Sequence, residues 1–563
     1  MKKIYLFALL CFVQRGFSQD LSNLKDQKPI AISGGINLNM STYNSLSGGQ
    51  TRLDPFSWTL SASPTLSLYG VQLPFFFLLN KQSRSLSGPF QQFGVSPTYK
   101  WAKAHLGYRN IMFSPYTLGG RLFNGVGLEL NPGKLRFAVV YGQFQKAELG
   151  YLSGTTPTNP TIPNGLTPAY QRTGYAMKLG FGTMQNHVDI SLLKIKDNQG
   201  SITFPVDFTR ITPDENTVVG FSHQFLLFKH LFWRSDVGVS LYTRDVRREM
   251  LDEEDLAKFA SIKNLVDIRK GTSLGWAGET TLGLQFNTFT IQGQYKLISS
   301  DYQSMGAYFF NTDMEEYTGS ATLAALQGKI QLSGTYGIQK DNVSKLKEYT
   351  TTRNIGAANL NVQFSKTLGL SVNYSNYGTT QNIPSQIIDT VKIAQLNQSL
   401  MIAPRWFKLS GKISHAVNGV VSYQNSNDLN TISKVRTDFN NLFGSLTYSY
   451  GIPSRKISFT PGLIYIRNLL PIYNTSSLGA SFAAQRGSKT NNFTTSLSVN
   501  YTQNAQNQVN TGSTFNTRLN GTYRLTKKQQ LTLSVSSIVN TDKKTERRNF
   551  SELYMNAGYG ISF

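Results

Sequence analysis

Apolar and polar residues alternate with a period of two along most of this chain, and this pattern restricts its fold more than any other feature. In 358–364, residues such as Leu360 and Val362 alternate with residues such as Asn359 and Asn361. The alternation resumes in 368–374 after a short Ser-Lys-Thr turn. Two such segments joined by a tight turn are typical of a β-hairpin with one apolar face. The sequence therefore predicts antiparallel strands.

The apolar runs are too short for a membrane-spanning helix. The longest one after residue 18 occupies residues 73–79, whereas a spanning helix needs ~20 apolar residues. Because lipid offers no hydrogen-bond partners to the backbone, a chain without such helices crosses a membrane only as a closed barrel.

Strand-like segments continue from Ile30 to Phe563 without a linker, and the pattern gives about 26 strands, with about 22 as the lower bound. Long connections, such as 147–170 and 245–271, alternate with short ones, such as 287–288. Outer-membrane barrels have short periplasmic turns and longer outer loops. The sequence therefore predicts an all-β fold: one large antiparallel transmembrane β-barrel with short periplasmic turns, long outer loops and one short helix in an outer loop.

Residues 1–18 have the layout of a secretory signal peptide. Lys2 and Lys3 precede a short apolar stretch, and Ser18 is a small residue before the expected cut. We therefore expect Sec export, removal of 1–18, a short periplasmic segment at 19–29, and a barrel over 30–563.

The only cysteine, Cys11, lies within this predicted signal. The mature chain would then have no disulfide and no thiolate metal site. With export and a barrel fold, the expected location is the cell outer membrane, where outer-membrane lipids surround the wall.

The C-terminal segment alternates like the others and ends on an aromatic residue. Tyr559, Ile561 and Phe563 share one face, with glycine and serine between them. This pattern resembles the β-signal that the barrel-assembly machinery recognises, so that machinery is an expected partner during insertion.

One segment of 245–271 breaks the alternation. Asp252, Glu253, Glu254 and Asp255 precede apolar residues at helical spacing. The helix either caps its own loop or folds inward and narrows the pore with its acidic end. Loop 147–170 is a second candidate constriction.

The charge balance is basic, with 55 Lys and Arg against 31 Asp and Glu. Two interpretations stay open: a positive lumen wall with a surface facing acidic head groups, or a preference for anionic solutes. Nucleic acid is not an expected partner, because no basic run is interleaved with aromatic residues.

No residue pattern predicts catalysis. His187 and Asp189 share the polar face of one segment and could act as an acid–base pair, but a solvated pair facing the lumen explains them more simply. We expect no enzyme, no catalytic residue, no cofactor and no metal site.

Residues 93–101, 104–109, 113–118 and 129–134 resemble a family of secreted outer-membrane β-barrel proteins of Bacteroidota that is functionally uncharacterised. The likeness covers roughly 28–215 and implies lineage and architecture, without a catalytic residue.

Two functions fit this sequence. The first is a pore or transport channel for polar or anionic solutes, gated by loops or by a partner. The alternative is a structural or interaction barrel, a scaffold in an outer-membrane secretion or assembly complex, whose outer loops bind a lipoprotein or a secretion-complex partner.

Overall fold

The structure is a computed structural model that describes residues 29–47, 53–69, 71–81, 92–148, 168–202, 211–252, 267–308, 311–382, 394–430, 433–543 and 549–563. The predicted signal peptide lies outside the described residues.

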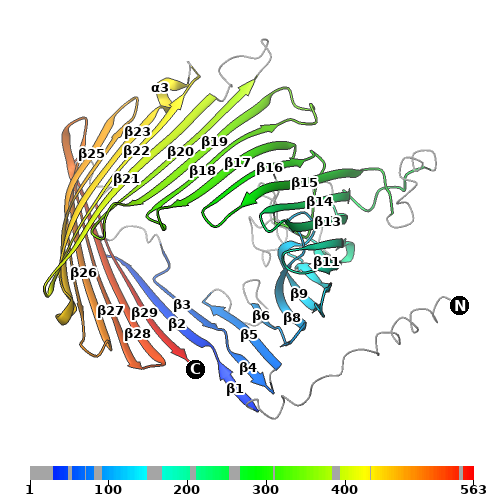
Figure 1. The fold of residues 1–563 in the computed structure, drawn as a ribbon, viewed down its shortest axis with the longest axis horizontal. Coiled ribbons are helices and arrows are strands. Elements are labelled where there is room, and N and C mark those ends of the chain that lie inside the picture. Colours follow the sequence, from blue (N-terminus) through cyan, green and yellow to red (C-terminus); the bar gives the residue numbers. More distant parts are fainter. Residues whose placement is uncertain are drawn as a thin grey trace.

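The strands run antiparallel around one sheet (Figure 1). From residue 102 onward each strand pairs with the next along the chain, whereas some of the shorter segments before it pair out of chain order. In the first half they are β1 (Ile30–Ser33), β2 (Gly35–Ser45), β3 (Phe56–Ala62), β4 (Thr65–Leu68), β5 (Val71–Asn80), β6 (Gln92–Val95), β7 (Thr98–Tyr99), β8 (Ala102–Met112), β9 (Gly119–Leu130), β10 (Leu135–Gln145), β11 (Gln171–Gly182), β12 (His187–Asn198), β13 (Glu215–Leu227), β14 (Leu231–Thr243), β15 (Thr272–Gln285) and β16 (Phe289–Ile298).

The second half of the wall contains β17 (Met314–Ala325), β18 (Ile330–Asp341), β19 (Thr350–Gln363), β20 (Leu368–Asn382), β21 (Ala394–Ser410), β22 (Ile413–Asp428), β23 (Phe439–Ile452), β24 (Ile457–Leu469), β25 (Asn474–Gly487), β26 (Phe493–Gln506), β27 (Val509–Thr526), β28 (Gln529–Asp542) and β29 (Phe550–Ser562). Short helices are η2 (Gln199–Ser201), α3 (Lys434–Thr437) and η5 (Pro453–Arg455).

These 29 segments make a closed barrel of 26 strands, which confirms the predicted fold class. Three of the strands are interrupted and therefore appear as the pairs β1/β2, β3/β4 and β6/β7. Pro64 and Pro97 lie in two of the gaps, and proline has no N–H to give to the ladder. Gly34 lies in the third gap with φ 127°, where a Cβ atom would be 2.4 Å from Ser63 O.

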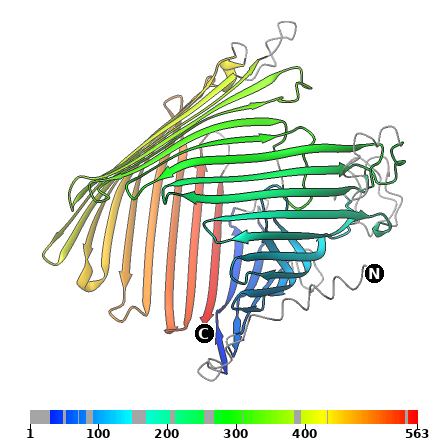
Figure 2. The same ribbon diagram turned by 45° about the vertical axis from the view of Figure 1, so that its right-hand side comes forward.

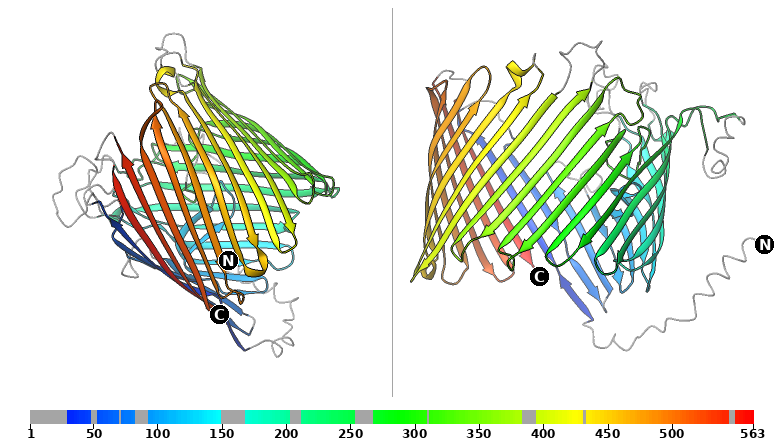
Figure 3. Two further views of the ribbon diagram at one scale, coloured as in Figure 1. Left: turned by 90° about the vertical axis from the view of Figure 1, so that its left-hand side faces the viewer. Right: turned by 45° about the horizontal axis from the view of Figure 1, so that its top comes forward.

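The barrel closes where β29 meets β2. Their register runs from Gly35 opposite Ser562 to Ser45 opposite Glu552. Beyond the strand ends, Gly34 and Phe563 exchange two backbone hydrogen bonds of 3.0 Å. The strands are steeply inclined (Figures 2 and 3), and the C-terminus lies at the end opposite α3.

The two faces of the wall differ in polarity. In β28, Leu531, Leu533 and Val535 point outward, while the residues between them point into the lumen. An apolar outer face over a polar interior is the arrangement of membrane-spanning barrels. No helix among the described residues is long and apolar enough to cross a membrane.

The end that carries the C-terminus is connected by short turns, and these turns are basic. Within their described residues there is no Asp or Glu, while their Lys and Arg residues are Lys100, Lys134, Lys229, Lys329, Lys366, Lys412, Arg455, Lys456, Lys489, Lys527 and Lys528. At the opposite end several basic side chains have acidic partners, for example Lys270 with Glu249 at 2.9 Å and Lys347 with Asp313 at 3.1 Å. Much of the excess positive charge therefore lies at the short-turn end.

The alternation of long and short connections is less strict than the sequence predicts. At the long-loop end, the connections 470–473 and 507–508 are as short as turns. Asn507 and Gln508 have φ values of 49° and 65°, which is the geometry of a two-residue hairpin turn. The one α-helix among the described residues, α3, lies in another loop at this end; the predicted helix in 245–271 falls mostly outside those residues.

Candidate luminal constriction

Two connections at the long-loop end fold into the lumen instead of extending from the barrel. They are residues 113–118, between β8 and β9, and residues 299–307, between β16 and β17; together we call them the luminal insert. Leu118 and Tyr302 are fully buried, although both belong to connections. Ser304 Oγ donates to Thr117 O at 2.7 Å, so the two segments also bind each other.

Three glycines on the inner face of the wall make room for the insert. A Cβ atom on Gly220 would be 2.4 Å from Thr117 Cγ2, and one on Gly238 would be 2.9 Å from Tyr116 Cβ. On Gly275 it would be 2.5 Å from the backbone N and Cα of Tyr302. The three positions lie on the neighbouring strands β13, β14 and β15. The insert therefore sits closer to the wall than any side chain would permit.

Asn216 of β13 joins the insert to the wall. Its Nδ2 lies 2.9 Å from Ser240 Oγ, 3.1 Å from Leu241 O and 3.2 Å from Gln303 O. Its Oδ1 accepts from the backbone N–H of Met305 at 2.9 Å. The side chain has no exposed surface, so these hydrogen bonds replace all contact with water.

An apolar core lies beneath the insert. Met305 and Leu118 pack with inward-facing residues of the wall, and the buried members of this cluster are Ile111, Phe113, Leu118, Phe123, Ala138, Val140, Phe144, Ala176, Leu193, Ile195, Val218 and Met305. Burial of this many apolar side chains is the main favourable contribution to holding a loop against a wall. The insert is therefore a packed part of the fold.

Two tyrosines complete the contact. Their rings meet edge to face, with centroids 6.1 Å apart, and Tyr302 Oη donates to Tyr116 O. Tyr116 Oη donates to Glu279 at 3.1 Å. Burial raises the pKa of Tyr116, and the Glu279 carboxylate raises it further. Burial likewise raises the pKa of Tyr302, so both phenols stay protonated donors at neutral pH.

Ion pairs reinforce the same side of the wall. Arg136 binds Asp189 with two contacts of 2.7 and 2.8 Å, and Arg172 binds Asp197 at 2.8 and 3.0 Å. Paired, hydrogen-bonded charges of this kind are rigid and do not act as free sites for solutes.

A Ser–His–Glu chain also lies on this side. Ser96 Oγ is 3.0 Å from His105 Nδ1, and His105 Nε2 is 2.7 Å from Glu129 Oε1. Ser96 and His105 are only 6% and 3% exposed. A nucleophile must reach its substrate, so we interpret this buried chain as support for the wall.

The inner wall from β18 to β29 is different, because it consists mainly of Ser, Thr, Asn, Gln and Gly. Its inward positions mostly keep contact with solvent, unlike those under the insert. The charged exceptions are Arg353, Arg405, Arg518, Arg524 and Glu552, together with Asp341, Asp428 and Asp542 at the outer strand ends. One side of the lumen is thus filled, and the other side presents a nearly uncharged polar wall.

The structure does not bring the sequence-predicted acid–base pair together. Asp189 is bound by Arg136, and His187 Nδ1 lies 3.1 Å from Thr183 O instead. Both positions face inward, as predicted, because they alternate along β12 with the outward-facing Ile190, but the prediction of a solvated pair is wrong for Asp189, which is buried.

The predicted acidic constriction cannot be placed in full. Asp252 is exposed and outside any helix or strand, while Glu253, Glu254 and Asp255 lie outside the described residues, as does most of loop 147–170. The predicted β-signal residues Tyr559 and Ile561 lie on the outward face of β29, in register with Leu38 and Ile36. Their recognition by the assembly machinery stays a prediction.

Sequence reasoning missed the luminal insert, although one signal for it exists. In the middle of β12 both faces carry apolar residues, since Ile190 and Leu192 face outward while Leu193 and Ile195 face the lumen. A strand of a large barrel needs apolar residues on its inner face only where something covers that face.

A further contact at the long-loop end gives a pH prediction. Asp313 accepts hydrogen bonds from Ser344 N and Oγ, both at 2.9 Å, and pairs with Lys347 at 3.1 Å. Burial alone would raise the pKa of Asp313, but these contacts outweigh it and hold the pKa below the ordinary value of 3.8. A depressed carboxyl pKa stabilises the fold above the unfolded value, and this contribution is lost as the pH falls through the folded value. We therefore expect protease cleavage within 342–349 to accelerate as the pH falls below about 4.

The matched variant is Asp313→Asn, which removes the titration while keeping the shape. Its loop should be cleaved faster than that of the unchanged protein at neutral pH, with little further change on acidification. An unchanged protein whose loop resists cleavage equally at pH 3 and pH 7 would contradict this prediction.

Comparisons with known proteins assign the chain to no family. No protein-family model matches it, and no curated protein does. Among solved structures, the translocation pore of the P pilus usher PapC is 11% identical, with a TM-score of 0.41 over 95% of this chain and 100% of that one. The FrpB iron transporter from Neisseria meningitidis is 10% identical, with a TM-score of 0.38 over 96% and 83%. The copper transporter OprC is 11% identical, with a TM-score of 0.39 over 94% and 80%. The resemblance to a Bacteroidota family stays a prediction.

Proposed function

We propose that this barrel lies in the outer membrane and conducts polar solutes, with a preference for anions, through the part of the lumen beside the luminal insert. The observation that carries this proposal is the inner wall from β18 to β29, which is hydrophilic, nearly uncharged and open to solvent.

The size of the barrel supports conduction. Strands spaced about 4.8 Å apart and tilted by about 45° give 26 strands a diameter of about 50 Å, and barrels with fewer strands already hold an aqueous channel. Inward side chains alone do not fill such a lumen. The luminal insert occupies one side of it and so determines the width that remains.

The charge pattern supports a preference for anions. Four arginines face the lumen from β19, β21 and β27, against the single Glu552 away from the strand ends. The short turns add basic residues around one mouth of the barrel, and charge of one sign at a mouth concentrates ions of the opposite sign.

Conductance of the purified protein in planar bilayers tests the proposal. We expect discrete conductance steps, and larger steps when residues 300–306 are replaced by a shorter glycine–serine connection. Failure of both proteins to conduct would refute it, provided that both migrate as folded barrels.

Selectivity gives a prediction of its own. Arg518 is exposed on the inner wall, between Ser498 and Ser536 of the neighbouring strands. Arg518→Gln should shift the reversal potential in a potassium chloride gradient toward cation permeation, because one luminal positive charge is removed. Arg467 of β24 lies on the outward face, so Arg467→Gln is the matched control and should leave the reversal potential unchanged. Equal effects of the two substitutions would count against a lumenal origin of the selectivity.

A further inference from the structure

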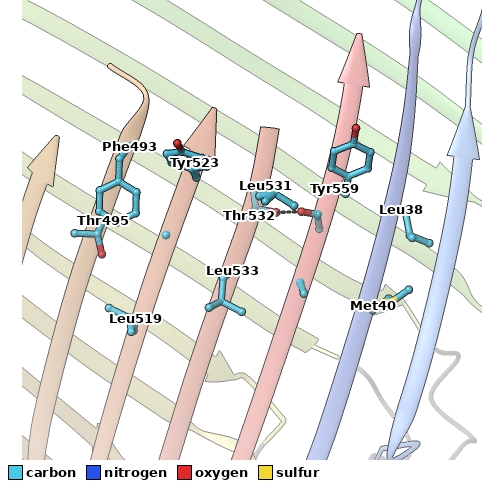
Figure 4. A pocket seen from close by; sticks show the side chains of 13 residues that line it. Leu38, Met40, Phe493, Thr495, Leu519, Tyr523, Leu531, Thr532, Leu533 and Tyr559 are labelled. Carbon is cyan, nitrogen blue, oxygen red and sulfur yellow. Dashed lines mark hydrogen bonds between the residues drawn. The ribbon is translucent and has the colours of Figure 1, made fainter. Parts of the chain in front are cut away.

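A groove of about 480 Å³ lies on the outer face of the barrel, beside the seam at which β29 meets β2 (Figure 4). It is lined mainly by outward side chains of β26, β27, β28, β29 and β2. The seam is fully paired along β2, so the groove is a surface site and does not lead into the lumen.

The strand register explains why this face is hollow. A first row across the five strands contains large residues, in the order Phe493, Tyr523, Leu531, Tyr559 and Leu38. The next row, farther from the short turns, contains Thr495, Gly521, Leu533, Ala557 and Met40. Three of these five residues are small, so the second row leaves a depression behind the aromatic row. A Cβ atom on Gly521 would meet nothing within 4 Å.

The surroundings of the groove are those of a membrane interface. Leu519 and Leu533 at the groove are 43% and 49% exposed, and such outward apolar residues face hydrocarbon in a spanning barrel. Figure 4 shows the hydroxyl of Tyr559 directed toward the end of its strand, as expected for a ring at the boundary between lipid tails and head groups.

Basic residues lie beside the groove at the short-turn end of the barrel. Lys527 and Lys528 form the turn between β27 and β28, directly beyond Tyr523 and Leu531, and Lys489 lies in the turn before β26. The described residues of these turns include no acid. Lysine side chains at such a position extend their ammonium groups to lipid phosphates.

We propose that this groove binds a phospholipid, with one acyl chain in the hollow over Gly521 and Ala557 and the phosphate at Lys527 and Lys528. The hollow provides apolar contact of the size usual for small-molecule sites, about 300–1,000 Å³, and the lysines provide the complementary charge. The site rests on the proposed membrane location, but it does not depend on whether the barrel conducts.

The probe is a phosphatidylglycerol that carries a photoactivatable group in one acyl chain, reconstituted with the full chain in lipid nanodiscs. Labelling should fall on peptides within 519–533 or 555–561. Gly521→Leu fills the hollow and should reduce this labelling about tenfold, the change expected when a few methylene groups lose their contact. Gly444 of β23 is also outward-facing, and a Cβ atom there would likewise meet nothing within 4 Å. Gly444→Leu is therefore the matched control and should label like the unchanged protein.

A second pair of variants tests the head group. Lys527→Gln with Lys528→Gln should weaken labelling, whereas Lys366→Gln, in another short turn, should not. The same experiment with a phosphatidylcholine probe separates the sources of attraction. Loss with both probes supports recognition of the phosphate, and loss with phosphatidylglycerol alone supports recognition of net negative charge.

Labelling of Gly521→Leu equal to that of the unchanged protein would overturn the proposal. So would a polypeptide that co-purifies with the unchanged protein and is lost in Gly521→Leu, because the groove would then be a protein interface. Folding of each variant is checked by its heat-dependent migration in gels, and the control substitutions show whether leucine on the outer face disturbs the barrel by itself.

Discussion

Gly275→Ala is expected to displace residues 299–307 from the wall and to increase the conductance of the barrel. The added Cβ atom would lie 2.5 Å from the backbone N and Cα of Tyr302. Because backbone atoms cannot rotate away as a flexible side chain can, the whole segment must shift. Overpacking of this kind typically costs about 1–3 kcal/mol. That cost opposes the seating of the insert, while the strand itself tolerates alanine.

Gly293→Ala is the matched control for this experiment. Gly293 lies on the next strand, β16, on the outward face, and a Cβ atom there would meet nothing within 4 Å. Conductance in planar bilayers and protease cleavage within 299–307 are the two measurements. If the insert of Gly275→Ala is cleaved faster while the barrel conducts like Gly293→Ala, the insert does not narrow the lumen. If the insert resists cleavage equally in both variants, the expected displacement is wrong.

The barrel itself could be predicted because its cause is distributed along the chain. Period-two alternation in segments such as 358–364 and 368–374 gives these strands one apolar and one polar face, and the structure pairs the two segments as β19 and β20. A single misjudged segment changes the strand count slightly and leaves the architecture intact.

Individual turns were harder to predict, because some of them have backbone geometry that is unusual for the residues they contain. Phe228 and Lys229 have φ values of 51° and 66°, and Leu326 and Gln327 have 52° and 59°. Hairpin turns of this geometry usually contain Asn or Gly. Because the register of the flanking strands is fixed by the barrel, other residues adopt this turn geometry here.

The luminal insert could not be predicted because its contacts join parts of the sequence that are far apart. Tyr302 meets Tyr116 across 186 positions, and Met305 meets Asn216 across 89. Taken alone, residues 299–307 look like an ordinary polar loop. Glycine at the inward positions 220, 238 and 275 has its explanation only once the insert is seated on them.

Asn216→Ala should release the insert through a different cause, the loss of hydrogen bonds without any clash. The substitution removes the acceptor of the Met305 N–H, in a place with no contact to water. An unsatisfied buried group costs about 1–3 kcal/mol, so hydrogen exchange at the Met305 amide should accelerate by about tenfold or more. Asn216→Asp should destabilise the seated insert more than Asn216→Ala does. Its carboxylate keeps an acceptor for Met305, but it faces the carbonyl oxygens of Leu241 and Gln303 and repels them.

Asn500 supplies the comparison, because it faces the lumen from β26 on the wall that the insert leaves open. Asn500→Ala should leave exchange at Met305 unchanged, which separates the loss of one buried contact from a general loosening of the barrel. If Asn216→Ala accelerates exchange while Gly275→Ala raises conductance, two independent perturbations release the same segment. If Asn216→Ala leaves the Met305 amide as protected as before, the apolar core beneath the insert holds it in place without the asparagine, and the width of the lumen depends on packing alone.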